Sequence, residues 1–178
     1  MRKYTAFLTF FLLVFAAFAP AQMDKSKRLS PPAQTQCKFA DGKSITVDYS
    51  SPRVKGRKIF GGLVAYGEVW RTGANEATTF VTTADLMVGG KAVPAGSYTI
   101  FTIPGEDKWT LIVNKKTGEW GIPYKYEADE LARVDMTASQ TSAPVENFAI
   151  SFEEKGGSCT LNIEWENTRA SISIAEKK

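Results

Sequence analysis

Histidine is absent from this chain of 178 residues, and cysteine occurs only twice, at Cys37 and Cys159. Without imidazole, Ser–His and Cys–His nucleophile pairs and the usual zinc and copper ligand sets cannot be assembled. Two thiols are also too few for a thiolate metal site. We therefore expect no metal, no cofactor and no catalytic residues, and the composition favours a protein that is not an enzyme.

Long apolar runs are missing too, except at the N-terminus. Arg2 and Lys3 precede an apolar run from Phe7 to Phe18, which is followed by Ala19-Pro20-Ala21. This order predicts a signal peptide over residues 1–21 that is cleaved before Gln22, and therefore a periplasmic or secreted protein. The run is shorter than the roughly 20 apolar residues of a membrane-spanning helix. An uncleaved anchor helix is the alternative, and no span is expected after cleavage.

An excess of one charge is also lacking. Without Arg2 and Lys3, the 22 basic side chains fall to 20, against 19 acidic ones. No basic cluster with interleaved aromatics occurs, so we expect no nucleic-acid partner. Residues 22–36 contain several cations and Ser30-Pro31-Pro32, which predicts a flexible tether. Residues 37–175 then form one domain by length, and 176–178 are a charged tail.

Short segments rich in β-branched and aromatic residues are what the chain does contain, and Gly, Pro, Asn and Asp separate them. This spacing predicts an all-β fold, a single antiparallel β-sandwich of jelly-roll-like or barrel-like form. One helical turn is expected at 129–133, and the irregular stretch 115–133 is expected to be functional or packed. The expected strands are 44–49, 58–60, 69–72, 78–83, a hairpin over 86–93, 97–103, 109–113, 148–153, 159–165 and 170–174.

The two cysteines allow a single intramolecular pairing, and an exported protein can keep it oxidised. A disulfide between Cys37 and Cys159 would connect the start of the domain to its last hairpin. The alternative is two buried thiols that never meet.

The densest group of polar residues is the block Trp70 to Thr78. Arg71 offers a planar fork of donors for a carboxylate, a phosphate or sugar hydroxyls, and Asn75 and Glu76 add further polar groups. We therefore regard Arg71, Asn75 and Glu76 as candidate ligand-binding residues. The structural alternative pairs Arg71 with Glu76 across a turn, places Asn75 in the left-handed region and buries Trp70 in the core.

Two further segments carry weaker signals. Arg53, Lys55 and Arg57 would form a rim that attracts anions, unless they belong to a solvated loop. Trp120, Tyr124 and Tyr126 surround a Gly and a Pro and would form an aromatic wall for a ligand, unless they cap one end of the sandwich.

Several of these segments together resemble the bacterial domain of unknown function family 2911. The resemblance spans roughly 43–174, and the block Trp70–Thr78 is its most specific part. It implies an exported, β-rich protein and no established activity, so it supplies no catalytic residues. The matching segments are Ser51-Pro52, Lys55-Gly56-Arg57, Ile59-Phe60-Gly61, Tyr66-Gly67, Val69 to Thr78, Pro94 to Tyr98 and Phe101 to Pro104.

The sequence leaves three functions open. The first is a non-enzymatic module that binds a small polar ligand or glycan. The second is a structural or protein-interaction component of the cell envelope. The third is a carboxylate-dependent hydrolase, which needs two acids about 5–10 Å apart. The acids available to it in these segments are Asp48, Glu68, Glu76 and Asp85. The oligomeric state stays open.

Overall fold

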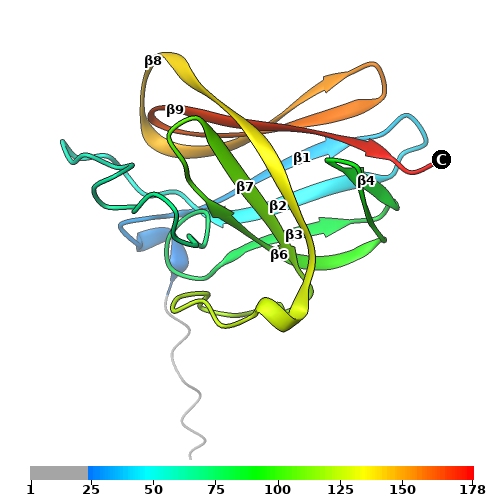
Figure 1. Ribbon diagram of the computed structural model, residues 1–178, viewed down its shortest axis with the longest axis horizontal. Helices are drawn as coiled ribbons and strands as arrows, with labels where there is room; N and C mark the ends of the chain where they lie inside the picture. Colours follow the sequence, from blue (N-terminus) through cyan, green and yellow to red (C-terminus); the bar gives the residue numbers. More distant parts are fainter. Residues whose placement is uncertain (1–23) are drawn as a thin grey trace, which may run out of the picture.

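The apolar segments of the chain become strands, and the computed structural model, which describes residues 24–178, is all-β as predicted (Figure 1). Apart from strands it contains two short 3-10 turns, η1 (Lys25–Lys27) and η2 (Glu127–Asp129). The strands are β1 (Pro32–Lys38), β2 (Ser44–Ser50), β3 (Thr78–Thr82), β4 (Leu86–Val88), β5 (Lys91–Val93), β6 (Gly96–Ile103), β7 (Lys108–Asn114), β8 (Glu130–Lys155) and β9 (Ser158–Glu176).

All nine strands belong to one antiparallel sheet, in the order β1-β2-β3-β6-β7-β8-β9-β4-β5. In β2, Ile45 and Val47 are buried while Thr46 between them is less so, which is the alternation expected of a strand with one apolar face. Strand β6 is buried on both faces, because Ile100 enters the main core and Phe101 a second cluster on the opposite side. Its sequence predicted a central strand, and it pairs with β3 and β7 in the middle of the sheet.

The sheet bends back on itself, so that β1 and β5 both contact β8. The predicted antiparallel all-β fold is therefore built from one sheet. The pairing of β8 with β9 shifts register between Gln140 and Val145. Pro144 lies in this gap and has no N–H to donate to a neighbouring strand. Beyond the gap, the outer half of the β8–β9 hairpin packs against β1. Hydrogen bonds from Val54 N to Glu146 O and from Phe148 N to Pro52 O join this hairpin to the chain that follows β2.

Aromatic side chains fill the centre of the core. Phe60, Trp70, Trp109, Phe148 and Trp165 are buried and contact one another with ring centroids 4.9 to 6.4 Å apart. Trp70 and Trp165 stack, with centroids 5.9 Å apart and ring planes 15° from parallel. The structural alternative that buries Trp70 in the core is therefore correct, and Trp70 also lines a pocket.

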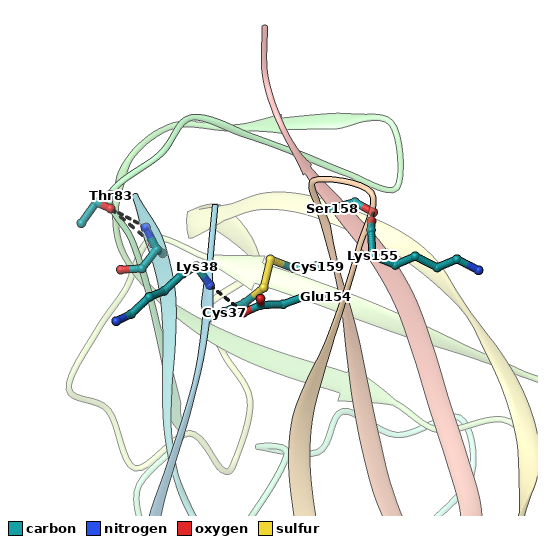
Figure 2. The surroundings of a disulfide bond; sticks show 8 residues. Cys37, Lys38, Thr83, Glu154, Lys155, Ser158 and Cys159 are labelled. Carbon is teal, nitrogen blue, oxygen red and sulfur yellow. Dashed lines mark hydrogen bonds between the residues drawn. A yellow bond between two sulfur atoms is a disulfide. The ribbon is translucent and has the colours of Figure 1, made fainter. Parts of the chain in front are cut away.

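The disulfide between Cys37 and Cys159 is present, with both residues buried. It joins the end of β1 to the start of β9 across 122 residues of sequence. Figure 2 shows the bond between the two hairpin tips, with a hydrogen bond of 3.1 Å from Lys38 N to Glu154 Oε1 beside it. We call this region the disulfide end of the molecule.

The first strand starts at Pro32, inside the segment 22–36 that was expected to be a flexible tether. β1 pairs with β2 from Pro32↔Ser50 to Lys38↔Ser44. The exposed face of β1 is polar, which hid its alternation in the sequence. Gln34 and Gln36 lie on that face and bond to Asp48 and Thr46 of the paired strand. These polar cross-strand contacts support a strand that hydrophobicity did not indicate.

The expected helical turn and two of the expected strands do not form. The helical turn at 129–133 is replaced by η2 and the start of β8 at Glu130, where Arg133 pairs instead with β7. Segments 58–60 and 69–72 are not strands and make only the isolated bridges Phe60↔Val64 and Trp70↔Thr102. Local turn hydrogen bonds and a left-handed residue at Thr72 interrupt them.

The expected signal peptide, residues 1–21, lies outside the described residues. Within 24–178, no helix is long and apolar enough to cross a membrane.

Candidate functional site

The irregular segment 52–74 lies at the end of the sheet away from the turn between β1 and β2, and so away from the disulfide (Figure 1). Together with Ser30, Ile122 and Trp165 it lines a pocket of about 400 Å³. Its wall includes the stacked indoles of Trp70 and Trp165, and its charged groups are Arg57, Glu68 and Arg71. Leu63 and Ile122 also line it and are 52% and 38% exposed. We call it the arginine pocket. Four separate parts of the chain build it: Ser30, the segment 52–74, Ile122 and Trp165.

The turn that carries Arg71 has an unusual backbone. Thr72 and Asn75 have φ angles of 55° and 58°, in the left-handed region. A β-branched residue rarely adopts this conformation. Thr72 is buried, and its Oγ1 lies 3.1 Å from Thr102 Oγ1 while its carbonyl accepts a hydrogen bond of 2.7 Å from Thr78 Oγ1. These buried contacts hold the strained turn, which fixes the direction of the Arg71 side chain.

Arg71 is half-buried and only partly bonded. Its Nη1 donates to Asn75 O at 2.7 Å and to Trp120 O at 3.3 Å. Its Cζ lies 5.0 Å from the centroid of the Trp120 ring, a cation–π contact. Among the described residues, its Nε and Nη2 have no hydrogen-bond partner and no carboxylate lies within ion-pair distance. Burial lowers the pKa of Arg71, which reflects the penalty on a partly desolvated cation.

Glu76 does not pair with Arg71, so the structural alternative for this block is wrong on that point. It binds the N-terminal segment instead, with its carboxylate 2.6 Å from Arg28 Nη1 and 3.3 Å from Lys25 Nζ. The hydrogen bond from Arg28 lowers the pKa of Glu76 to about 2. Asn75, which is left-handed as that alternative expected, donates from Nδ2 to Ser30 O at 3.1 Å. Asn75 and Glu76 therefore fix residues 25–30 beside the arginine pocket.

The three candidate aromatics lie outside the lining of the arginine pocket. Tyr124 and Tyr126 pack on Phe101 of β6, with ring centroids 4.9 and 6.1 Å away. Tyr124 also donates to Glu130 at 2.7 Å, and burial followed by this hydrogen bond raises its pKa above the ordinary value. Trp120 is 56% exposed and supports Arg71 through its ring and its carbonyl. Tyr124 and Tyr126 therefore pack on the face of the sheet that carries Phe101, whereas the packing alternative placed the aromatics at one end of the sandwich.

The candidate anion rim lies next to the arginine pocket. Arg53, Lys55 and Arg57 line a neighbouring pocket of about 300 Å³, and Arg57 lines both. Arg53 Nη1 donates to Ser51 O at 2.6 Å, and Arg57 Nε donates to Val54 O at 3.0 Å. The structure therefore brings Arg57 and Arg71, which were separate candidates in the sequence, to one site.

The acids required by a hydrolase are distributed over the molecule. Among residues 24–178, Glu68 is the one carboxylate that lines the arginine pocket. Asp48 and Glu76 line a separate pocket of about 140 Å³, and Asp85 accepts a hydrogen bond from Ala95 N at 2.8 Å. Across residues 24–178, no group of three or more acidic or cysteine side chains is placed to hold a metal ion.

Sequence reasoning named Glu68 only as an acid available to a hydrolase, and it missed Leu63, Ile122 and Trp165 as lining residues. Leu63 follows Gly61-Gly62 and Ile122 lies between Gly121 and a cis Pro123, so both are apolar residues within turn sequences. An apolar residue in a turn is often exposed, and exposed apolar residues can mark a binding site. This pattern could have identified Leu63 and Ile122 from the sequence. Trp165 gave none, because its strand pattern correctly indicated the core.

A family model described as "Protein of unknown function (DUF2911)" matches residues 30–174. The chain belongs to this family. The match begins just before β1, and it contains every residue that lines the arginine pocket. Lys25 and Arg28, which bind Glu76, precede the matched residues of the DUF2911 domain. Comparison of the chain with curated proteins and with solved structures found no match.

Proposed function

We propose that this protein is an exported, non-enzymatic module that binds a small polar ligand in the arginine pocket. The observation that carries the proposal is Arg71, a half-buried cation with one edge of its guanidinium open and no carboxylate partner among the described residues. A desolvated charge of this kind is costly unless something compensates it. A bound ligand that accepts hydrogen bonds would do so.

The surroundings of Arg71 suit a ligand of small size. A volume of about 400 Å³ lies within the range of about 300–1,000 Å³ that is common for small-molecule sites. The lining combines apolar walls with a few polar groups, which is the usual division between affinity and orientation. Support for export comes from the leader-like sequence 1–21 and from the disulfide, which an oxidising compartment preserves.

The distribution of acids favours binding over hydrolysis. A glycosidase needs a second carboxyl group across the substrate, and the arginine pocket offers only Glu68 within the described part of the chain. Arg28 and Lys25 hold Glu76 ionised and lower its pKa to about 2. A carboxyl group with this pKa cannot act as a general acid at neutral pH.

Ligand screening by NMR on wild type and Arg71→Ala tests the proposal. We expect polar compounds to shift the backbone amides of residues 57–74 and the variant to lose these shifts while it stays folded. Arg133→Ala is the matched control, because Arg133 is exposed and paired with Glu130 on β8. If Arg71→Ala only lowers stability and keeps its ligands, the block serves the fold, as the structural alternative holds.

A further inference from the structure

The arginines of this protein fall into two groups. Six lie in the described residues, and three of them have a carboxylate partner: Arg28 with Glu76, Arg133 with Glu130, and Arg169 with Glu153 and Glu164. Within residues 24–178, the other three, Arg53, Arg57 and Arg71, have no carboxylate within 4.0 Å. These three line the arginine pocket or the pocket that adjoins it.

Each unpaired guanidinium is held in place without being neutralised. Arg53 and Arg57 donate to backbone carbonyl oxygens of the turn 51–54, and Arg71 donates to those of Asn75 and Trp120. A carbonyl oxygen orients a guanidinium but leaves its unit charge in place. The fold therefore fixes cations around a site to which the described part of the chain contributes a single carboxylate, that of Glu68.

Arg71 has the geometry to bind two oxygen atoms together. Its protein hydrogen bonds all use Nη1. The opposite edge carries Nε–H and one N–H of Nη2, which point in parallel. This pair matches the two oxygens of a carboxylate in a bidentate contact.

Much of the rest of the lining is apolar. The buried, stacked indoles of Trp70 and Trp165 belong to it, and its exposed apolar surface comes from Leu63 and Ile122, which are 52% and 38% exposed. The Nε1 of Trp165 is buried and has no hydrogen-bond partner among the described residues. A wholly hydrophilic ligand would leave these apolar surfaces in contact with water, which is unfavourable.

We propose that the ligand of the arginine pocket is an organic carboxylate with an apolar body. Its carboxylate binds the open edge of Arg71 and lies in the field of Arg57, and its body packs against Leu63 and Ile122. This inference rests on the proposed function and narrows it from polar ligands in general to one chemical class.

Calorimetric titration with three probes tests the class. The probes are 3-phenylpropionate, its neutral amide 3-phenylpropionamide, and acetate, which has the charge without the body. We expect the phenylpropionate to bind about tenfold or more tightly than either of the others, because a charge-assisted contact and the buried ring each contribute. Higher salt should weaken its binding. Equal binding of the amide, or of acetate, would overturn the proposal.

Variants locate the contact. Arg71→Gln should reduce the affinity for 3-phenylpropionate about tenfold or more, and Arg133→Gln should leave it unchanged. Should Arg71→Gln fail to fold, Arg57→Gln replaces it, and we expect a reduction of several-fold from loss of a nearby charge. Full affinity in a folded Arg71→Gln or in Arg57→Gln contradicts the proposal.

The same titrations can be followed by NMR and extended to glucose as a neutral polar probe. They then separate the claim that the pocket binds a small polar ligand from the claim that this ligand is a carboxylate. If glucose or the amide shifts the amides of residues 57–74 and the carboxylate does no better, the ligand class is wrong and the binding module stands. If none of the four probes shifts those amides, neither claim is supported, and both are rejected.

Discussion

The two ends of the molecule differ in backbone regularity and in how their charged side chains are paired. At the disulfide end, two regular hairpins meet and are joined covalently, and Lys43 there is paired with both Asp41 and Glu176. At the opposite end the backbone is irregular and turns through left-handed residues. Among the described residues, Arg53, Arg57 and Arg71 there have carbonyl partners and no carboxylate partner.

Hollow space does not distinguish the two ends. Pockets of about 430 and 570 Å³ lie near the disulfide end, where the turn Gly156-Gly157 and the chain terminus form much of their lining. The arginine pocket has a similar volume, about 400 Å³, but a lining of indoles and half-buried cations. The arginine pocket therefore differs from the pockets at the disulfide end in the residues and charges of its lining, and not in its volume.

The largest effect on the free energy of unfolding should come from removal of the disulfide. Replacement of Cys37 and Cys159 by serine removes a link across 122 residues. The chain-entropy model predicts a loss of about 4–5 kcal/mol in the free energy of unfolding, measured by equilibrium denaturation in urea. If the two ends are independent, 3-phenylpropionate should bind the folded variant as well as it binds wild type. A loss of binding would show that the disulfide shapes the pocket.

Substitution at Gly121 should disturb the pocket end. A Cβ there would lie 2.9 Å from Ala77 Cβ and 3.2 Å from Arg71 Cβ, at a φ of 93°. Gly121→Ala should therefore lower the free energy of unfolding by about 2–3 kcal/mol and weaken binding, since the carbonyl of Trp120 is adjacent.

Gly118→Ala is the matched control for this change. Gly118 has a φ of 76° and open space around it, so only the backbone penalty of about 1 kcal/mol applies. Equal losses for the two variants would mean that crowding beside Arg71 is unimportant.

Tyr124→Phe measures how firmly the loop 115–129 is attached to the sheet. The phenol donates to Glu130 at 2.7 Å and accepts from Asn114 Nδ2 at 3.2 Å. Its removal should lower the free energy of unfolding by about 1–1.5 kcal/mol in thermal melts. Tyr126→Phe, which loses a longer bond of 3.4 Å to Glu119, should have about half that effect or less. The reverse order would assign the attachment to Tyr126.

The smallest effect concerns the N-terminal segment. Because the folded pKa of Glu76 is about 2, below its ordinary 4.5, its ionised form stabilises the fold. That stabilisation is complete above about pH 5 and is lost as the pH falls toward 2. Since the side chain is 41% exposed, screening should keep the effect near or below about 1 kcal/mol.

Glu76→Gln should therefore be less stable than wild type at pH 7 and equal to it near pH 2, when stability is followed by urea denaturation across the pH range. A difference between the two proteins that does not depend on pH would show that charge pairing with Lys25 and Arg28 is not the cause.

The sequence predicted the fold wherever apolar residues alternate or continue. Strands β2 and β6 follow from their patterns, whereas β1 did not, because Gln34 and Gln36 conceal its alternation. The pairing of Cys37 with Cys159 was predictable, since no other intramolecular pair exists.

The candidate site was only partly predictable. Arg71 was identified as a candidate by its residue type. The ion pair between Arg71 and Glu76 that the structural alternative expected does not form. The left-handed residues Thr72 and Asn75 lie between them, and Glu76 binds Arg28 instead. The approach of Arg57 to Arg71 depends on distant contacts that no local pattern records. One is the hydrogen bond from Ile59 N to Glu166 Oε2, and another joins Val54 N to Glu146 O.

An NMR titration with 3-phenylpropionate, followed at the Arg71 Nε–H and at the backbone amides of both ends, tests the central claim most directly. We predict that the Arg71 Nε–H resonance and the amides of residues 57–74 shift together and saturate, while the amides around Cys37 and Cys159 stay in place. An unmoved Arg71 resonance, or shifts of equal size at both ends, would contradict the claim.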